Sequence, residues 1–121
     1  MPRFRFIPRP QSEAPVKPFA SAEEAWFWFA RAAKARRDGV RFEGGPNSWQ
    51  RPCDPDDIQR ALNALYRQGA VGATHVAALV RFGAAERAPD VRCEEEFAFV
   101  APWDEAIDRL AAPLKAKGIV A

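Results

Sequence analysis

Hydrophobic residues recur at helical spacing in four segments of the chain, and polar or proline-rich stretches separate these segments. An amphipathic helix places an apolar residue at every third or fourth position along one face. The pattern therefore predicts a mainly α-helical small bundle. Its helices are expected over residues 21–39, 54–69, 73–82 and 102–118.

The first of these helices is apolar on more than half of its circumference. Ser21 and Glu24 form a capping box, in which each side chain satisfies a free backbone donor of the other residue, and Gly39 is expected to end the helix. A second apolar sector, around Trp28 and Ala32, lies outside the main core stripe. Such a helix is either central to the bundle or forms an interface with a protein partner or in a homodimer.

The second and third helices are joined by a short turn that contains glycine. Asp54 caps the second helix and Pro55 occupies its first position, while Gly83 is expected to end the third helix. The predicted core residues are Ile58, Ala61, Leu62, Leu65, Tyr66, Val76, Leu79 and Val80, and the predicted outward residues of the third helix are Thr74, Ala78 and Arg81.

The C-terminal segment contains two prolines. Residues 94–100 fit either a helical turn or a short strand. The last helix is expected to begin near Pro102 and to be disturbed at Pro113, because an internal proline removes a backbone hydrogen bond. Gly118 is expected to end this helix, and Ile119 to fold back against its last turn.

Prolines also separate an arm from the rest of the chain. Residues 1–20 contain five prolines, which exclude a helix and predict an extended basic arm. Residues 21–121 are then expected to form a single helical domain. Within it, residues 40–50 suggest a short β-ribbon around a glycine-rich turn, with an irregular loop as the alternative.

Composition excludes several classes of protein. Apolar residues make up 48% of the 121 residues and charged residues 28%, which excludes wholesale disorder. The longest apolar run, residues 26–30, is much shorter than the roughly 20 residues of a membrane helix. Arginines and prolines interrupt the first ten residues before a secretory leader can build, so we expect a cytoplasmic protein with no membrane contact.

Positive charge is concentrated in the first third of the chain. Residues 1–41 carry nine lysines and arginines against four acids, a net charge of +5, whereas residues 82–121 carry five bases and eight acids, a net charge of −3. An anionic partner would therefore be drawn to the N-terminal part of the chain.

The second and third helices have the sequence form of a helix-turn-helix. In that motif the first turn of the third helix meets base edges, and basic residues around it contact phosphate. A basic arm can also enter a minor groove. The candidate DNA-binding residues are Arg3, Arg5 and Arg9 of the arm, Arg60 and Arg67 of the second helix, and Thr74, His75 and Arg81 of the third.

The segment LYRQGAVGATHVAALVRFG, followed by a helix that begins Trp103-Asp104-Glu105-Ala106, resembles the three-helix DNA-binding heads of small phage-type and sigma-like bacterial regulators. The resemblance covers about half of the chain. It implies a small DNA-binding transcription regulator. In such families the last helix can be the reading helix, which here would expose Asp104, Glu105, Asp108 and Arg109.

No motif of the chain assembles a catalytic or metal site. Cys53, His75 and Cys93 are separated by 22 and 18 residues, without the paired spacing of metal ligands. No phosphate-binding loop or nucleophile elbow is present either. We therefore expect a non-enzymatic, cofactor-free DNA-binding regulator. The alternative is a protein–protein interaction module that uses the surface around Trp28 and Ala32.

Overall fold

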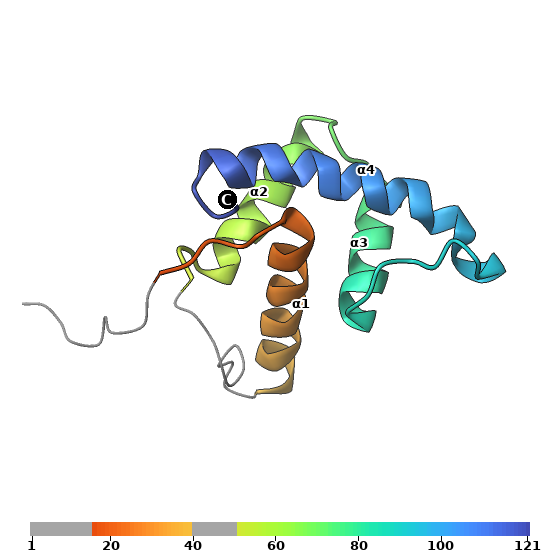
Figure 1. The fold of residues 1–121 in the computed structure, drawn as a ribbon, viewed down its shortest axis with the longest axis horizontal. Helices are drawn as coiled ribbons and strands as arrows, with labels where there is room; N and C mark the ends of the chain where they lie inside the picture. The colour runs from red at the N-terminus through yellow and green to blue at the C-terminus, as the bar shows by residue number, and fades with distance from the viewer. Residues whose placement is uncertain (1–15, 40–50) are drawn as a thin grey trace, which may run out of the picture.

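Four helices make up the part of the chain that the computed structural model describes, residues 16–39 and 51–121. They are α1 (Ala22–Asp38), α2 (Pro55–Arg67), α3 (Ala73–Ala85) and α4 (Glu94–Ala116), packed as a small bundle (Figure 1). The predicted mainly α-helical class is confirmed. The expected ribbon at 40–50 and the first 15 residues of the predicted arm lie outside the described residues.

The ends of α1 follow the local sequence. The Ser21 hydroxyl accepts a hydrogen bond from the Glu24 N–H at 3.1 Å, as predicted. The Glu24 carboxylate accepts from the N–H of Ala20 at 2.7 Å, one residue earlier than a capping box requires. Gly39 ends the helix in the left-handed conformation, with φ of 72°.

α1 and α4 each pack against all three of the other helices, so α1 is covered on several sides. Trp28 is only 8% exposed, and its ring centroid lies 5.2 Å from that of Phe19. Ala32 is buried as well. The expectation that Trp28 and Ala32 form an exposed interface is therefore wrong, since neighbouring segments of the same chain cover this second apolar sector of α1.

α3 continues past the glycine that was expected to end it. The helix runs to Ala85, and the left-handed residue after it is Glu86, with φ of 57°. Gly83 lies inside the helix and faces Trp26 of α1. A glycine can serve close packing as well as helix termination. At position 83 the packing role applies.

α4 begins at Glu94, eight residues before the predicted start, and contains both Pro102 and Pro113. Three glutamates in its first turn complement the positive end of the helix dipole. Residues 94–100 are therefore helical, and the strand alternative is wrong. At the other end, Gly118 is left-handed and the Ile119 N–H donates to the Leu114 carbonyl at 2.9 Å, as predicted.

Three of the predicted burial assignments are wrong. Tyr66 and Val80 are 53% and 60% exposed, although both were expected in the core. Ala78, expected to face outward, is fully buried. The small side chains at positions 78 and 83 let α3 approach its neighbours closely, so the covered face of α3 is rotated away from Val80. The predicted core residues Ile58, Ala61, Leu62 and Leu79 are buried.

The described ends of the chain pair with each other. Phe19 forms an isolated parallel bridge with Val120. The Phe19 N–H donates to the Ile119 carbonyl, and the Ala121 N–H donates to the Phe19 carbonyl, both at 2.9 Å. Buried Phe19 thereby attaches the segment before α1 to the C-terminus.

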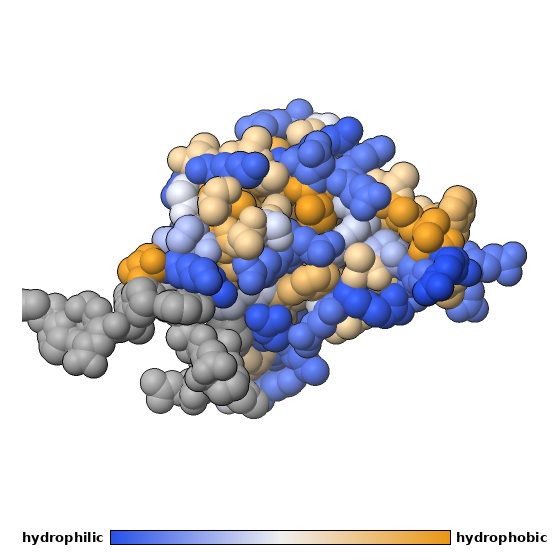
Figure 2. All heavy atoms as spheres, viewed as in Figure 1, coloured by the Kyte–Doolittle hydropathy of each residue, from blue (hydrophilic) through white to orange (hydrophobic). Residues whose placement is uncertain are grey.

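The amino-terminal end of α4 projects beyond α3, and hydrophobic side chains gather there on the surface (Figures 1 and 2). Phe97, in the first turns of α4, is 62% exposed, and Val91 just before the helix is 58% exposed.

None of the four described helices is long and apolar enough to span a membrane.

Candidate functional site

The described arginines among the predicted DNA-binding residues have different surroundings. Arg60 forms an ion pair with Asp57 at 2.8 Å. The guanidinium carbon of Arg81 lies 4.9 Å from the ring centroid of Phe99, a cation–π arrangement. Arg67 is exposed in the last turn of α2. The arm residues Arg3, Arg5 and Arg9 lie outside the described residues.

His75 fastens the start of α3 to α4. Its Nδ1 accepts the N–H of Gly72 at 3.0 Å, so the neutral ring carries its proton on Nε2, which lies 2.8 Å from a carboxylate oxygen of Glu105. This hydrogen bond, followed by the charge of Arg109, holds the pKa of the Glu105 carboxyl below its usual range. Both ring nitrogens of His75 are therefore engaged within the chain, whereas neighbouring Thr74 is exposed.

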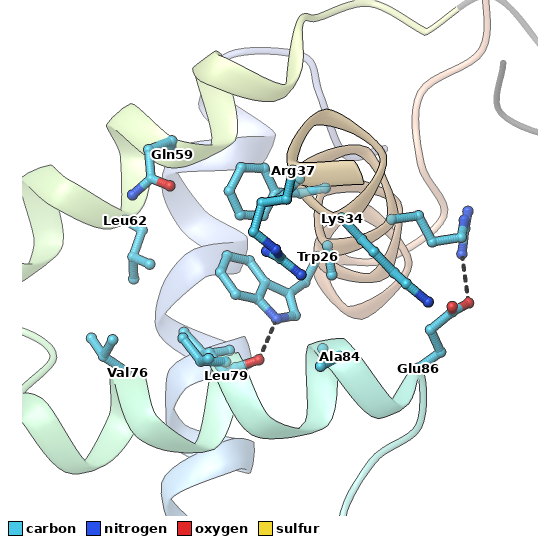
Figure 3. A pocket seen from close by; sticks show the side chains of 15 residues that line it. Trp26, Lys34, Arg37, Gln59, Leu62, Val76, Leu79, Ala84 and Glu86 are labelled. Carbon is cyan, nitrogen blue, oxygen red and sulfur yellow. Dashed lines mark hydrogen bonds and ion pairs between the residues drawn. The ribbon is translucent and has the colours of Figure 1, made fainter. Parts of the chain in front are cut away.

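The turn between α2 and α3 does not bring the two helices into contact. Within the described residues, α2 and α3 each pack against α1 and α4, and not against each other. Figure 3 shows α2 and α3 on two sides of a common space and α1 on a third side. The consequence is a space bounded by three helices.

This space is an open cavity of about 420 Å³ between α1, α2 and α3 (Figure 3). We call it the α1–α3 cavity. Trp26 of α1 and Leu62 of α2 line it, together with Val76 and Leu79 of α3. Its volume falls within the range of roughly 300–1,000 Å³ that is usual for ligand sites.

Small side chains explain why the cavity is not filled. Ala30 and Ala33 of α1 face it, as does Ala84 of α3. The indole of Trp26 is held in place because its N–H donates to the Leu79 carbonyl at 2.9 Å. The polar atom of Trp26 is thereby satisfied, and the ring presents apolar surface to the cavity.

Basic side chains of α1 stand on one side of the cavity. Figure 3 shows Lys34 extending from α1 toward the end of α3 that carries Glu86, and Arg37 in front of Trp26 in this view. Within the described residues neither base has an ion-pair partner, whereas Arg31, also in the lining, lies 3.7 Å from Glu86. The cavity therefore combines an apolar lining with cationic groups, which suits an apolar group that carries a nearby negative charge.

The cavity was missed in the sequence because its lining residues have the pattern of a core. Leu62, Val76, Leu79 and Val80 were all assigned to the interior from their helical spacing. A signal was nevertheless present. The alanines at positions 30 and 33 leave one side of a tryptophan-rich helix with little volume.

The environment of the Cys53 thiol does not favour nucleophilic chemistry. Burial, followed by the negative charges of Asp57 and Asp54, raises the pKa of Cys53 to about 11. A thiol with this pKa is a poor nucleophile at neutral pH. Among residues 16–39 and 51–121, no three His, Cys, Asp or Glu side chains lie close enough together to hold a metal ion.

Comparison with known proteins adds no relative: no protein-family model, no curated protein and no solved structure matches this chain.

Proposed function

We propose that this chain is a non-enzymatic protein-interaction module that binds apolar side chains of a partner in the α1–α3 cavity. The observation that carries the proposal is the cavity itself, open and lined by Trp26, Leu62 and Leu79. Val80 of the same lining is 60% exposed and Val76 is half-buried. This accessible apolar surface loses contact with water when a partner side chain enters, which is the main driving force of such associations.

The charge beside the cavity defines the partner further. Lys34 and Arg37 favour a segment with Asp or Glu next to its apolar residues, and they would repel a basic one. An amphipathic helix meets both requirements, because it can place apolar residues and carboxylates on adjacent strips of one surface.

DNA binding is the less favoured function. Arg60 is neutralised by Asp57, and His75 is engaged at both nitrogens. The acidic Glu105 lies next to the start of α3, where it would oppose phosphate. Lys34 and Arg37, in contrast, have no ion-pair partner within the described residues, and they lie beside an apolar cavity.

A dye-binding experiment tests whether the cavity accepts ligands. Anilinonaphthalene sulfonate combines an aromatic body with a negative charge, so saturable fluorescence enhancement is expected with the wild type. Val80→Asp should abolish it, because Val80 lines the cavity and is 60% exposed. Val91→Asp is the matched control, since Val91 is 58% exposed and lies outside the lining.

Peptide displacement then tests whether the ligand is a protein segment. A synthetic helical peptide with leucines on one face and glutamates beside them should displace the dye, and a version with lysines in place of the glutamates should do so about tenfold less well. Failure of both peptides would overturn the proposal. So would salt-sensitive binding of duplex DNA between about 50 and 200 mM salt that Val80→Asp leaves unchanged.

A further inference from the structure

The projecting end of α4 has the chemistry that the cavity favours. Residues 94–108 contain six carboxylates and neither lysine nor arginine. Glu96 is buried and bound to Arg87, but Glu94 and Asp104 are exposed and have no ion-pair partner within the described residues. The exposed carboxylates of Glu94 and Asp104 are therefore uncompensated, whereas Glu105 is bound by His75 and Arg109.

One strip of α4 combines this charge with an apolar centre. Positions 94, 97, 101 and 104 are three or four residues apart and so lie along one face of the helix. All four are exposed. The strip reads Glu94, Phe97, Ala101, Asp104, and we call it the α4 strip. A large aromatic side chain with 62% exposure at its centre is typical of an interface anchor.

We propose that the α4 strip of one molecule docks in the α1–α3 cavity of a second copy. Phe97 would enter the apolar lining beside Trp26, and the flanking carboxylates would face Lys34 and Arg37. Charge complementarity supports this occupant, since the bases beside the cavity and the acids of the strip both lack partners within the described residues. The inference rests on the proposed function of the cavity.

The proposed contact joins two different surfaces of the molecule. The strip lies on α4, whereas the cavity is lined by α1, α2 and α3. A copy with a damaged cavity and a copy with a damaged strip would therefore still form one intact contact between them. This property distinguishes the proposed contact from association through a single self-complementary patch.

Sedimentation velocity of the full chain tests the proposal. The average mass of the wild type should rise with concentration, and Val80→Asp and Phe97→Lys should each weaken self-association at least about tenfold. An equimolar mixture of these two variants should recover a dimer. Tyr66→Asp is the control, since Tyr66 is 53% exposed and belongs to neither the lining nor the strip, and it should associate like the wild type. Circular dichroism should show that all variants keep their helices.

Charge reversal provides a second measurement. Lys34→Glu with Arg37→Glu should weaken association, and mixing this variant with Glu94→Lys, Asp104→Lys should restore it. A wild type that stays monomeric, or a mixture of Val80→Asp and Phe97→Lys that does not associate, would overturn the inference. If the acidic peptide still displaces the dye from that monomer, the proposed function stands and only its assignment to a second copy fails.

Discussion

The indole of Trp26 lies so close to the backbone of Gly83 that a β-carbon at position 83 would be 2.8 Å from the indole Nε1. The same β-carbon would be 3.2 Å from the Ala30 side chain. The ring cannot easily move away, because its N–H is bonded to the Leu79 carbonyl. The contact between α1 and α3 therefore requires glycine at this position.

Gly83→Ala should destabilise the protein by roughly 1–3 kcal/mol, the usual cost of overpacking a core. In an open helix the same change would stabilise by about 1 kcal/mol. Urea denaturation measures the difference. Gly72→Ala is the control, since a β-carbon there meets nothing within 4 Å, and its cost should stay near the roughly 0.5–1 kcal/mol of placing alanine at the N-cap of a helix. A more stable Gly83→Ala variant would contradict the close contact.

Trp28→Glu should prevent folding, because Trp28 is 8% exposed and a buried, unpaired carboxylate costs several kcal/mol. The milder Trp28→Ala should lose about 3–5 kcal/mol. Far-ultraviolet circular dichroism and urea denaturation report both effects. Val91→Glu, on the surface, should keep the wild-type fold. A folded Trp28→Glu protein that has merely lost a partner would restore the interface expected from the sequence.

His75→Ala should lower the free energy of unfolding by about 1–2 kcal/mol, because the Gly72 N–H loses its acceptor and Glu105 loses its donor. A double-mutant cycle with Glu105→Ala should show coupling between the two side chains. Thr74→Ala, at the exposed neighbouring position, is the control and should change stability little. If His75→Ala were as stable as the wild type, the hydrogen bonds of His75 to Gly72 and Glu105 would not contribute to the stability of the fold.

Glu96 should make the protein sensitive to acid. Two hydrogen bonds from Arg87, followed by one from the Asp90 N–H, lower the pKa of Glu96 from 4.5 to about 2. Folding stabilises the ionised form of the Glu96 side chain over the protonated form. This contribution to stability is therefore present above pH 4.5 and is lost as the pH falls toward 2.

Glu96→Gln should therefore be less stable than the wild type at pH 7, and the difference should shrink between pH 4.5 and 2. Urea denaturation at several pH values measures it. Glu95→Gln, at the exposed adjacent position, should show no such convergence. A stability difference for Glu96→Gln that does not depend on pH would rule out the proposed role of this carboxylate.

Local sequence signals predicted the end of a helix correctly wherever the capping hydrogen bonds join residues that are close together in the sequence. Ser21 and Gly39 bound α1, and Gly118 with Ile119 ends α4 as expected. The same signals were wrong at Gly83 and Pro102. At Gly83 the conformational freedom of glycine is used for packing against Trp26, and Pro102 lies in a helix that starts two turns earlier.

The candidate site depended on information that no local pattern contains. Helical spacing places Val76, Leu79 and Val80 near one face of α3, yet Leu79 is buried and Val80 is exposed. The spacing also could not reveal that α1, α2 and α3 bound a common cavity, because this depends on how far α2 and α3 lie from each other.

Sequence alone established the helical class and most of the helix boundaries, because caps, turns and periodicity act between residues close together in the chain. Tertiary packing decided which faces are covered, moved Trp28 into the core and opened the cavity beside Lys34 and Arg37. The period of a helix shows which residues share a face, but the burial of that face depends on the size and direction of side chains from distant segments.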